Sequence, residues 1–171
     1  MVVPLGSSLR NATLMKRWWI IPLVVIGLDH AAKWVIQTTL PYGTSIPITG
    51  FFNVIHVWNT GAAFSFLANQ SGWQRYFFIV LAIIVSAVLA WMLRKPLPMS
   101  EAIAFSLIVG GALANALDRL VRGYVVDFLD FYWREWHWPA FNAADIAITC
   151  GAGLLIAGSF LSARSSNTPR E

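Results

Sequence analysis

Four long apolar runs constrain this chain more than any other feature. They cover about residues 18–36, 76–93, 102–121 and 142–161. A helix needs about 20 mainly apolar residues to cross the hydrocarbon core of a bilayer, and a helix pairs its own backbone polar groups there. The runs therefore predict an all-α polytopic membrane protein with four transmembrane helices.

The composition agrees with a membrane protein. Charged residues make up 12% of the chain and hydrophobic residues 57%, whereas a soluble domain carries about 25% charge. With 171 residues, the chain has room for one membrane-embedded domain, residues 1–171. Its net charge of +4 comes from bases that cluster beside the apolar runs. This pattern is typical of the positive-inside rule and does not indicate a nucleic-acid partner.

Cysteine and histidine give no sign of a metal centre. Cys150 is the single cysteine and lies within the last apolar run, so we interpret it as a buried structural thiol. His30, His56 and His137 are far apart in the sequence and show no metal-ligand spacing. We expect neither a metal nor another cofactor.

Two segments outside the runs are expected to share one membrane surface. Residues 37–73 contain FFNVIHVWN at 51–59, whose alternation predicts a strand, followed by a turn and a short amphipathic segment. Residues 122–141 read as a loop whose tyrosines and tryptophans favour the membrane–water interface. Seven of the 12 Lys and Arg residues lie on the side of the termini. We therefore expect cytoplasmic termini, with both segments on the outer face.

Two aspartates are the strongest functional candidates. Asp127 lies just beyond the third run, and Asp145 lies in the first turn of the fourth. An antiparallel pair of helices would bring both to the outer interface. Close carboxylates share a proton, so one can act as a general base on water while the other acts as an acid. Asp145 should ionise more easily beside a helix N-terminus, although coupled titration leaves the individual roles open.

Polar residues accompany both acids. On the third run, one helical face carries Gly111, Asn115, Asp118, Arg119 and Arg122, at i, i+4, i+7, i+8 and i+11. This face becomes more polar toward Asp127. On the fourth run, Asn142 precedes Asp145 by one turn.

Other polar residues allow a structural interpretation as well. Asp29 and Lys33 are four residues apart, and an ion pair between them is as plausible as a direct role. The small residues at 110 and 111 favour close helix packing. Asn59 and Gly61 fit a simple turn as well as a site. Asp130 and Glu135 read as helix caps or solvated charges.

Two other classes of protein compete with an enzyme. Intramembrane acids also suit a small proton-coupled transporter or channel subunit, but the sequence shows no internal repeat. A non-enzymatic assembly factor would tolerate replacement of the acids.

Five motifs bear on this choice, in this order: DHAAK (29–33), NTGAAFSFLA (59–68), GGALANALDR (110–119), VVDF (125–128) and FNAADIAI (141–148). With them, the chain resembles the prolipoprotein signal peptidases, or signal peptidase II, from about Trp18 to Leu161. The resemblance implies a four-span aspartyl endopeptidase of the bacterial inner membrane. Such an enzyme removes the signal peptide of diacylglyceryl-modified prolipoproteins, cutting before the lipidated cysteine.

The resemblance also assigns roles to particular parts of the chain. It places the catalytic pair at Asp127 and Asp145, and it implies a small periplasmic β-cradle and a short amphipathic periplasmic helix within residues 37–73. It implies membrane lipids as partners and inhibition by the cyclic peptide globomycin. The other family positions fall on Asp29, Lys33, Asn59, Gly61, Asn115, Arg119, Asn142 and Ala144, and Asp118 joins them from the polar face described above.

Overall fold

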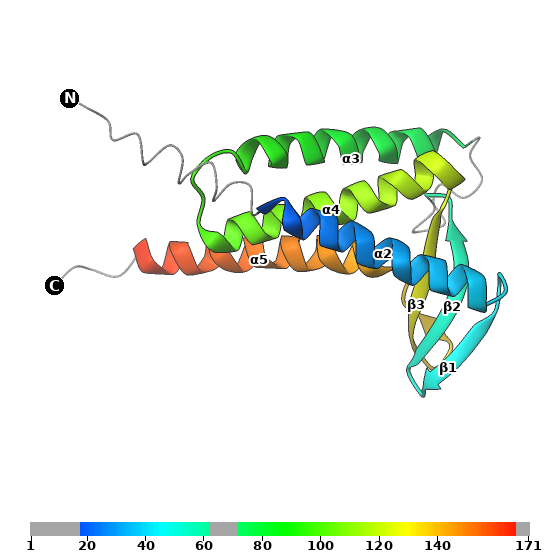
Figure 1. Cartoon of the computed structure of the whole chain (residues 1–171). Helices are drawn as coiled ribbons and strands as arrows, with labels where there is room; N and C mark the ends of the chain where they lie inside the picture. Colours follow the sequence, from blue (N-terminus) through cyan, green and yellow to red (C-terminus); the bar gives the residue numbers. More distant parts are fainter. Residues whose placement is uncertain (1–17, 62–71, 167–171) are drawn as a thin grey trace, which may run out of the picture.

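The computed structural model describes residues 18–61 and 72–166, with side chains up to Phe160. Four helices run side by side, and a sheet lies across one end of them (Figure 1). The elements, in order, are α2 (Ile20–Thr39), β1 (Ser45–Thr49), β2 (Phe52–Asn59), α3 (Trp73–Met92), α4 (Met99–Arg122), β3 (Val125–Trp133), β4 (Trp136–His137) and α5 (Ala143–Ser166).

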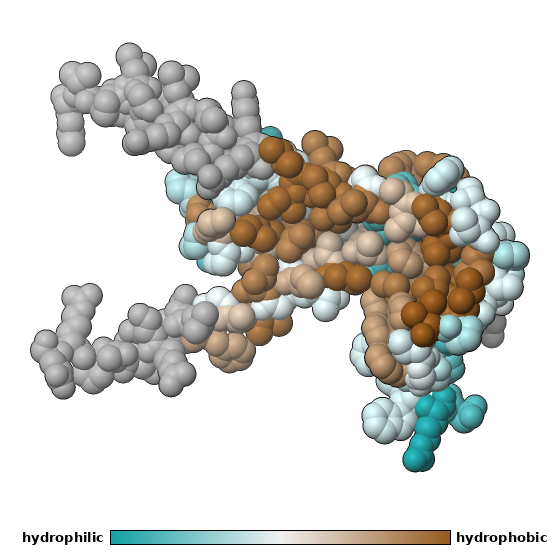
Figure 2. All heavy atoms as spheres, turned by 60° about the horizontal axis from the view of Figure 1, so that its bottom comes forward, coloured by the Kyte–Doolittle hydropathy of each residue, from teal (hydrophilic) through white to brown (hydrophobic). Residues whose placement is uncertain are grey.

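All four predicted spans are helices. Within the described residues, α2, α3, α4 and α5 are each long and apolar enough to cross a membrane. Their bounds agree with the predicted runs to within a few residues. Apolar side chains cover much of the visible helical surface, whereas the most hydrophilic residues lie at the tip of the sheet (Figure 2). This distribution confirms a polytopic membrane protein.

Helix α4 is the centre of the bundle. It packs against α2, α3 and α5, and 56% of its most apolar 18-residue window is buried, compared with 6% in α3. Glycines allow this close packing, as predicted. A Cβ on Gly110 would lie 2.8 Å from Cβ of Val25 on α2, and one on Gly111 would overlap the carbonyl oxygen of Ala144 on α5. The helix ends at Gly123, whose φ of 89° is the left-handed conformation of a helix C-cap.

The sheet is larger than predicted. Its four strands are antiparallel in the order β1-β2-β3-β4. The predicted strand at 51–59 is β2, and its pairing with β3 confirms that residues 37–73 and 122–141 lie together. The interpretation of residues 122–141 as a loop is wrong, because β3 and β4 both lie entirely within this segment. Its aromatic residues pair across strands: Phe131 lies opposite Phe52.

Two other sequence expectations have different outcomes. Cys150 is exposed, so its interpretation as a buried thiol is wrong. It lies on the face of α5 that borders a cavity instead of the face that packs on α4. The predicted amphipathic segment after the turn at residue 61 lies outside the described residues.

Candidate active site

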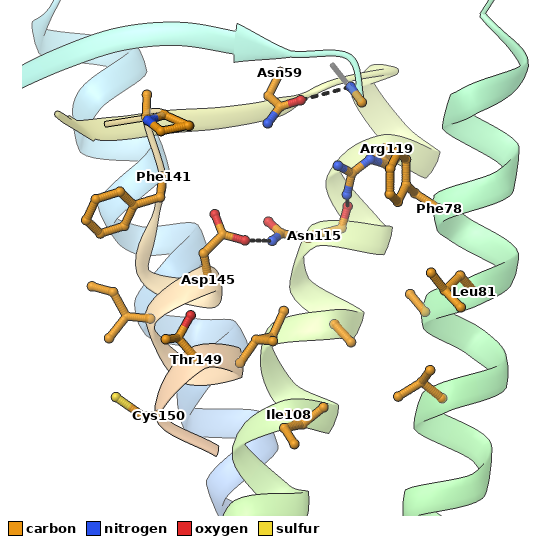
Figure 3. A pocket seen from close by; sticks show the side chains of 18 of the residues that line it. Asn59, Phe78, Leu81, Ile108, Asn115, Arg119, Phe141, Asp145, Thr149 and Cys150 are labelled. Carbon is orange, nitrogen blue, oxygen red and sulfur yellow. Dashed lines mark hydrogen bonds between the residues drawn. The ribbon is translucent and has the colours of Figure 1, made fainter. Parts of the chain in front are cut away.

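A largely apolar cavity of about 680 Å³ lies between α3, α4 and α5. Helices α3 and α5 both pack on α4, and no packing between them is found over the described residues, so they form opposite walls. Figure 3 shows the cavity extending from Ile108 and Cys150, farther along the helices from the sheet, to Asn59 and Arg119 near the sheet. The strand-to-helix segment 138–141 adds a rim.

Asp145 is oriented by the start of its own helix. Its backbone N–H donates to Oδ1 of Asn142 at 3.0 Å, while its Oδ2 accepts the backbone N–H of Asn142 at 3.1 Å. This reciprocal arrangement resembles a capping box, with the acid at the third helical position. Its Oδ1 also accepts Nδ2 of Asn115 at 2.8 Å. The carboxylate is thereby held at the cavity wall, which it helps to line.

Asp127 approaches from the sheet. It is 2% exposed on β3, where β2 lies alongside it. Its Oδ2 accepts Nδ2 of Asn59 at 3.0 Å, and its Oδ1 accepts Nδ2 of Asn142 at 2.6 Å. Asn142 therefore binds both acids, through its side-chain amide at Asp127 and its backbone N–H at Asp145. The structure brings together the two carboxylates singled out in the sequence.

The environment of Asp127 favours its protonated form. Burial raises the pKa of Asp127 to about 7, and the nearby charge of Asp145 adds to this rise. Hydrogen bonds from Asn59 and Asn142 and the charge of Lys33 act in the opposite direction. A carboxyl group with a pKa near 7 can gain or lose a proton at neutral pH, as acid–base catalysis requires.

A buried cluster of charges supports the pair from behind. Lys33 is fully buried on α2, and its Nζ lies 2.6 Å from Oδ2 of both Asp29 and Asp118. The predicted Asp29–Lys33 ion pair is thus present, and Asp118 extends it to α4. Arg122 also pairs with Asp118. Because these charges balance, each buried ion has a partner of opposite sign.

This cluster contacts the acids through neutral groups. Lys33 Nζ donates to Oδ1 of Asn115 at 3.0 Å, which orients the amide so that Nδ2 points to Asp145. Asp29 Oδ1 accepts the backbone N–H of Ala144 at 2.9 Å. Both contacts fix the first turn of α5, where Asp145 lies.

The remaining predicted residues lie at the end of the cavity near the sheet. Gly61 has a φ of 114°, and its N–H donates to Oδ1 of Asn59 at 2.8 Å, so it belongs to the turn that holds Asn59. Arg119 lines the cavity with its guanidinium 4.9 Å from the ring centre of Phe78. Over residues 18–61 and 72–166, no group of three or more His, Cys, Asp or Glu could hold a metal ion.

Sequence reasoning missed two parts of this region. Asp130 is 5% exposed and accepts hydrogen bonds from Asn53 and His137, so its interpretation as a cap or solvated charge is wrong. It is buried because β2, β3 and β4 meet around it. The rim at 138–141 was also missed, because it follows a strand that was read as a loop.

A bundle of four apolar helices, with two adjoining carboxyl groups at one end of a cavity, defines a polytopic membrane protein. Comparison with known proteins is more specific. A family model described as signal peptidase (SPase) II matches residues 21–161. The chain therefore belongs to the signal peptidase II family.

Individual relatives agree with this family. The chain is 54% identical over 143 residues to the lipoprotein signal peptidase of Serratia marcescens, covering 84% of each chain. It is 56% identical over 140 residues to the lipoprotein signal peptidase of Cupriavidus necator, covering 81% of this chain and 80% of the relative. A solved structure, described as a bacterial membrane enzyme obtained by the in meso method at 2.3 Å resolution, aligns with a TM-score of 0.77. Its identity is 31%, and the alignment covers 91% of this chain and 94% of that one. Membership of a peptidase family does not support the transporter or channel alternative.

Proposed function

We propose that Asp127 and Asp145 are the catalytic pair of this peptidase. The protein is an aspartic-type endopeptidase that removes the signal peptide from prolipoproteins. The observation that carries the residue assignment is the position of Asn142, which hydrogen-bonds both carboxyl groups. The acids thus adjoin at the end of an apolar groove, where a hydrophobic signal segment would present its scissile bond. In this proposal, residues 1–171 work as one membrane-embedded peptidase domain.

The reaction uses one proton shared by the pair. The ionised carboxylate takes a proton from a water molecule as the water attacks the scissile carbonyl carbon. The protonated partner gives its proton to the carbonyl oxygen, which forms a tetrahedral intermediate. The intermediate collapses when the carboxyl group that took the water's proton gives it to the leaving nitrogen and the C–N bond breaks. The other carboxylate takes a proton back from a hydroxyl of the intermediate, which restores the pair to its starting state. The raised pKa of Asp127 favours its protonated form.

The supporting residues have two kinds of role. Asn59, Asn115 and Asn142 orient the carboxyl oxygens by direct hydrogen bonds. Asp29, Lys33, Asp118, Gly61 and Ala144 hold those asparagines or the first turn of α5. Arg119 reaches into the cavity as a cation without a carboxylate ion pair in the described part of the chain. It is placed to bind the scissile peptide's carbonyl groups.

The substrate enters from the bilayer in this proposal. It carries a diacylglyceryl group on the cysteine that directly follows the scissile bond. The signal segment and this lipid are both apolar, so the substrate diffuses within the membrane. The cavity between α3 and α5 is mainly apolar and meets the acids at the end near the sheet. The sheet then acts as a periplasmic β-cradle, and both termini are cytoplasmic in the bacterial inner membrane. Helix α2 starts on the side of the bundle opposite the sheet, and α5 finishes on that same side (Figure 1). This arrangement supports the proposed orientation. Globomycin would inhibit by filling the same groove.

The test is cleavage of a diacylglyceryl-modified prolipoprotein by purified protein in lipid. Asp127→Asn and Asp145→Asn should each abolish detectable cleavage, while Glu135→Gln, an exposed acid on the β3–β4 hairpin, should cut at the wild-type rate. If either Asn variant is folded and cuts normally, the catalytic pair is misassigned. If the wild-type protein cuts nothing and does not bind globomycin, the proposed substrate is wrong.

A further inference from the structure

The rim of the cavity is weakly held by regular structure. Trp138, Pro139, Ala140 and Phe141 form this rim, between β4 and the start of α5. β4 has only two residues, both exposed. So short a strand provides little stability of its own. The backbone N–H of Trp138 donates to the carbonyl of Phe131 at 2.8 Å. A side-chain interaction adds to this single backbone bond at the end of the rim nearest β4.

A buried carboxylate supplies this interaction. Asp130 on β3 accepts Nδ2 of Asn53, from β2, at 2.8 Å. Nδ1 of His137, from β4, lies 2.9 Å from Asp130 Oδ1 and donates to it. The His137 ring also stacks on Tyr132, with ring centres 5.3 Å apart. One aspartate thus joins three strands, immediately before the rim.

We propose that the hydrogen bond between Asp130 and His137 positions the rim for substrate binding. The proposal rests on the function proposed above, because it takes the cavity as the substrate groove. His137 directly precedes Trp138, so its bond acts together with the backbone bond of Trp138 to fix the end of the rim nearest β4. His137 and Asp130 are positioning residues here and do not reach the scissile bond.

The other end of the rim is held independently. Phe141 donates its N–H to Leu129 at 3.1 Å, and its carbonyl accepts the N–H groups of Phe128 and Leu129 at 3.0 and 2.9 Å. Loss of the His137 bond leaves Trp138 held at its end by the backbone bond to Phe131 alone, which loosens the rim ahead of Phe141. Asn142 and the carboxyl groups it binds stay in place. Substrate affinity should weaken while the chemical step is preserved.

Two substitutions at one position separate the hydrogen bond from the ring. His137→Phe keeps a ring to stack on Tyr132 but removes the donor, whereas His137→Asn keeps a donor near the Nδ1 position without the ring. With a diacylglyceryl-modified prolipoprotein in lipid, His137→Phe should raise KM by about threefold to tenfold, as expected for one half-exposed hydrogen bond. Its kcat should stay within about twofold of wild type, and His137→Asn should restore KM. Glu135→Gln, on the same hairpin, is the matched control.

Several outcomes would overturn the proposal. A wild-type KM in His137→Phe would show that the bond does not position the rim. A lower kcat with unchanged KM would indicate only a loss of folded protein, and failure of His137→Asn to restore KM would show that the donor is not responsible. If His137→Phe does not fold, Asp130→Asn serves instead, because it leaves one acceptor oxygen for two donors and should raise KM in the same way. Failure of the catalytic pair itself is detected separately, by cleavage in Asp145→Asn.

Discussion

The close approach of α4 and α5 gives the sharpest test of how the acids are positioned. A Cβ on Gly111 would overlap the carbonyl oxygen of Ala144 and lie 2.8 Å from Cγ1 of Ile148. The carbonyl belongs to the helix backbone, so it cannot move aside as a side-chain end would. Gly111→Ala must therefore push the first turn of α5 away from α4.

The size of the effect follows from the contact. Restoring ordinary van der Waals distance requires the helices to separate by about 1 Å, and a misplacement of about 1 Å at a reacting centre costs roughly 100-fold in rate. Asp145 moves with α5, whereas Asp127 stays on the sheet. The substitution also favours helix formation by about 1 kcal/mol, so α4 itself should remain intact. We expect kcat to fall by about 100-fold in a protein that still folds.

Two other glycines provide controls. A Cβ on Gly153 of α5 has nothing within 4 Å, so Gly153→Ala should keep wild-type activity. Gly110→Ala would press on Val25 of α2, away from the Asp145 helix, and should reduce stability more than kcat. The assay is cleavage of a lipidated prolipoprotein, with thermal unfolding as the measure of folding. A kcat within threefold of wild type in Gly111→Ala would refute the dependence of the acid pair on this helix contact.

Three further predictions concern ionisation, burial and access. The pKa of Asp127 is raised from 3.8 to about 7, so the folded state binds the extra proton between these values. The free energy of unfolding should therefore fall from pH 4 to pH 7, and Asp127→Asn should reduce that slope. Lys33→Met leaves Asp29 and Asp118 buried without their shared cation and should lower stability by about 3–5 kcal/mol; an unchanged melting temperature would contradict the buried cluster. Cys150 is exposed on the cavity wall, so an apolar maleimide should label it and block cleavage, and protection by globomycin, read by mass spectrometry, would place the inhibitor in this groove.

Much of the fold could be predicted because its signals are local. A run of about 20 apolar residues specifies a membrane-spanning helix whatever its neighbours. Helix length then sets the depth of a residue, which is why Asp127 and Asp145 could be placed at one surface. The i, i+4 spacing on α4 similarly put Asn115 on the face that reaches Asp145.

The incorrect predictions concern residues whose surroundings depend on how helices pack and strands pair, which the local sequence does not specify. Hydropathy does not say which faces of α3 and α5 remain unpaired, so Cys150 was assigned to the interior. Residues 125–133 combine strand alternation with aromatic rings typical of a membrane interface, and the second signal was given more weight. Asp130 is buried because β3 pairs with both β2 and β4. β2 lies far from Asp130 in the sequence, and β4 was not predicted. The Asn142–Asp145 cap could have been found, because an Asn three residues before an acid at the start of a run is a helix N-terminal signal.

The partners of the two acids explain how a shared proton can persist between them. A lysine or arginine bound directly to either carboxylate would favour its ionised form and expel the proton. Here the direct side-chain partners are the amides of Asn59, Asn115 and Asn142. A neutral amide donates to a carboxylate without forcing its partner to ionise. The Lys33 ammonium acts one residue further back, through Asn115, and its charge is already balanced by Asp29 and Asp118. The protein thus uses charge to fix the geometry of the site and neutral groups to contact the acids, so the proton remains free to move during hydrolysis.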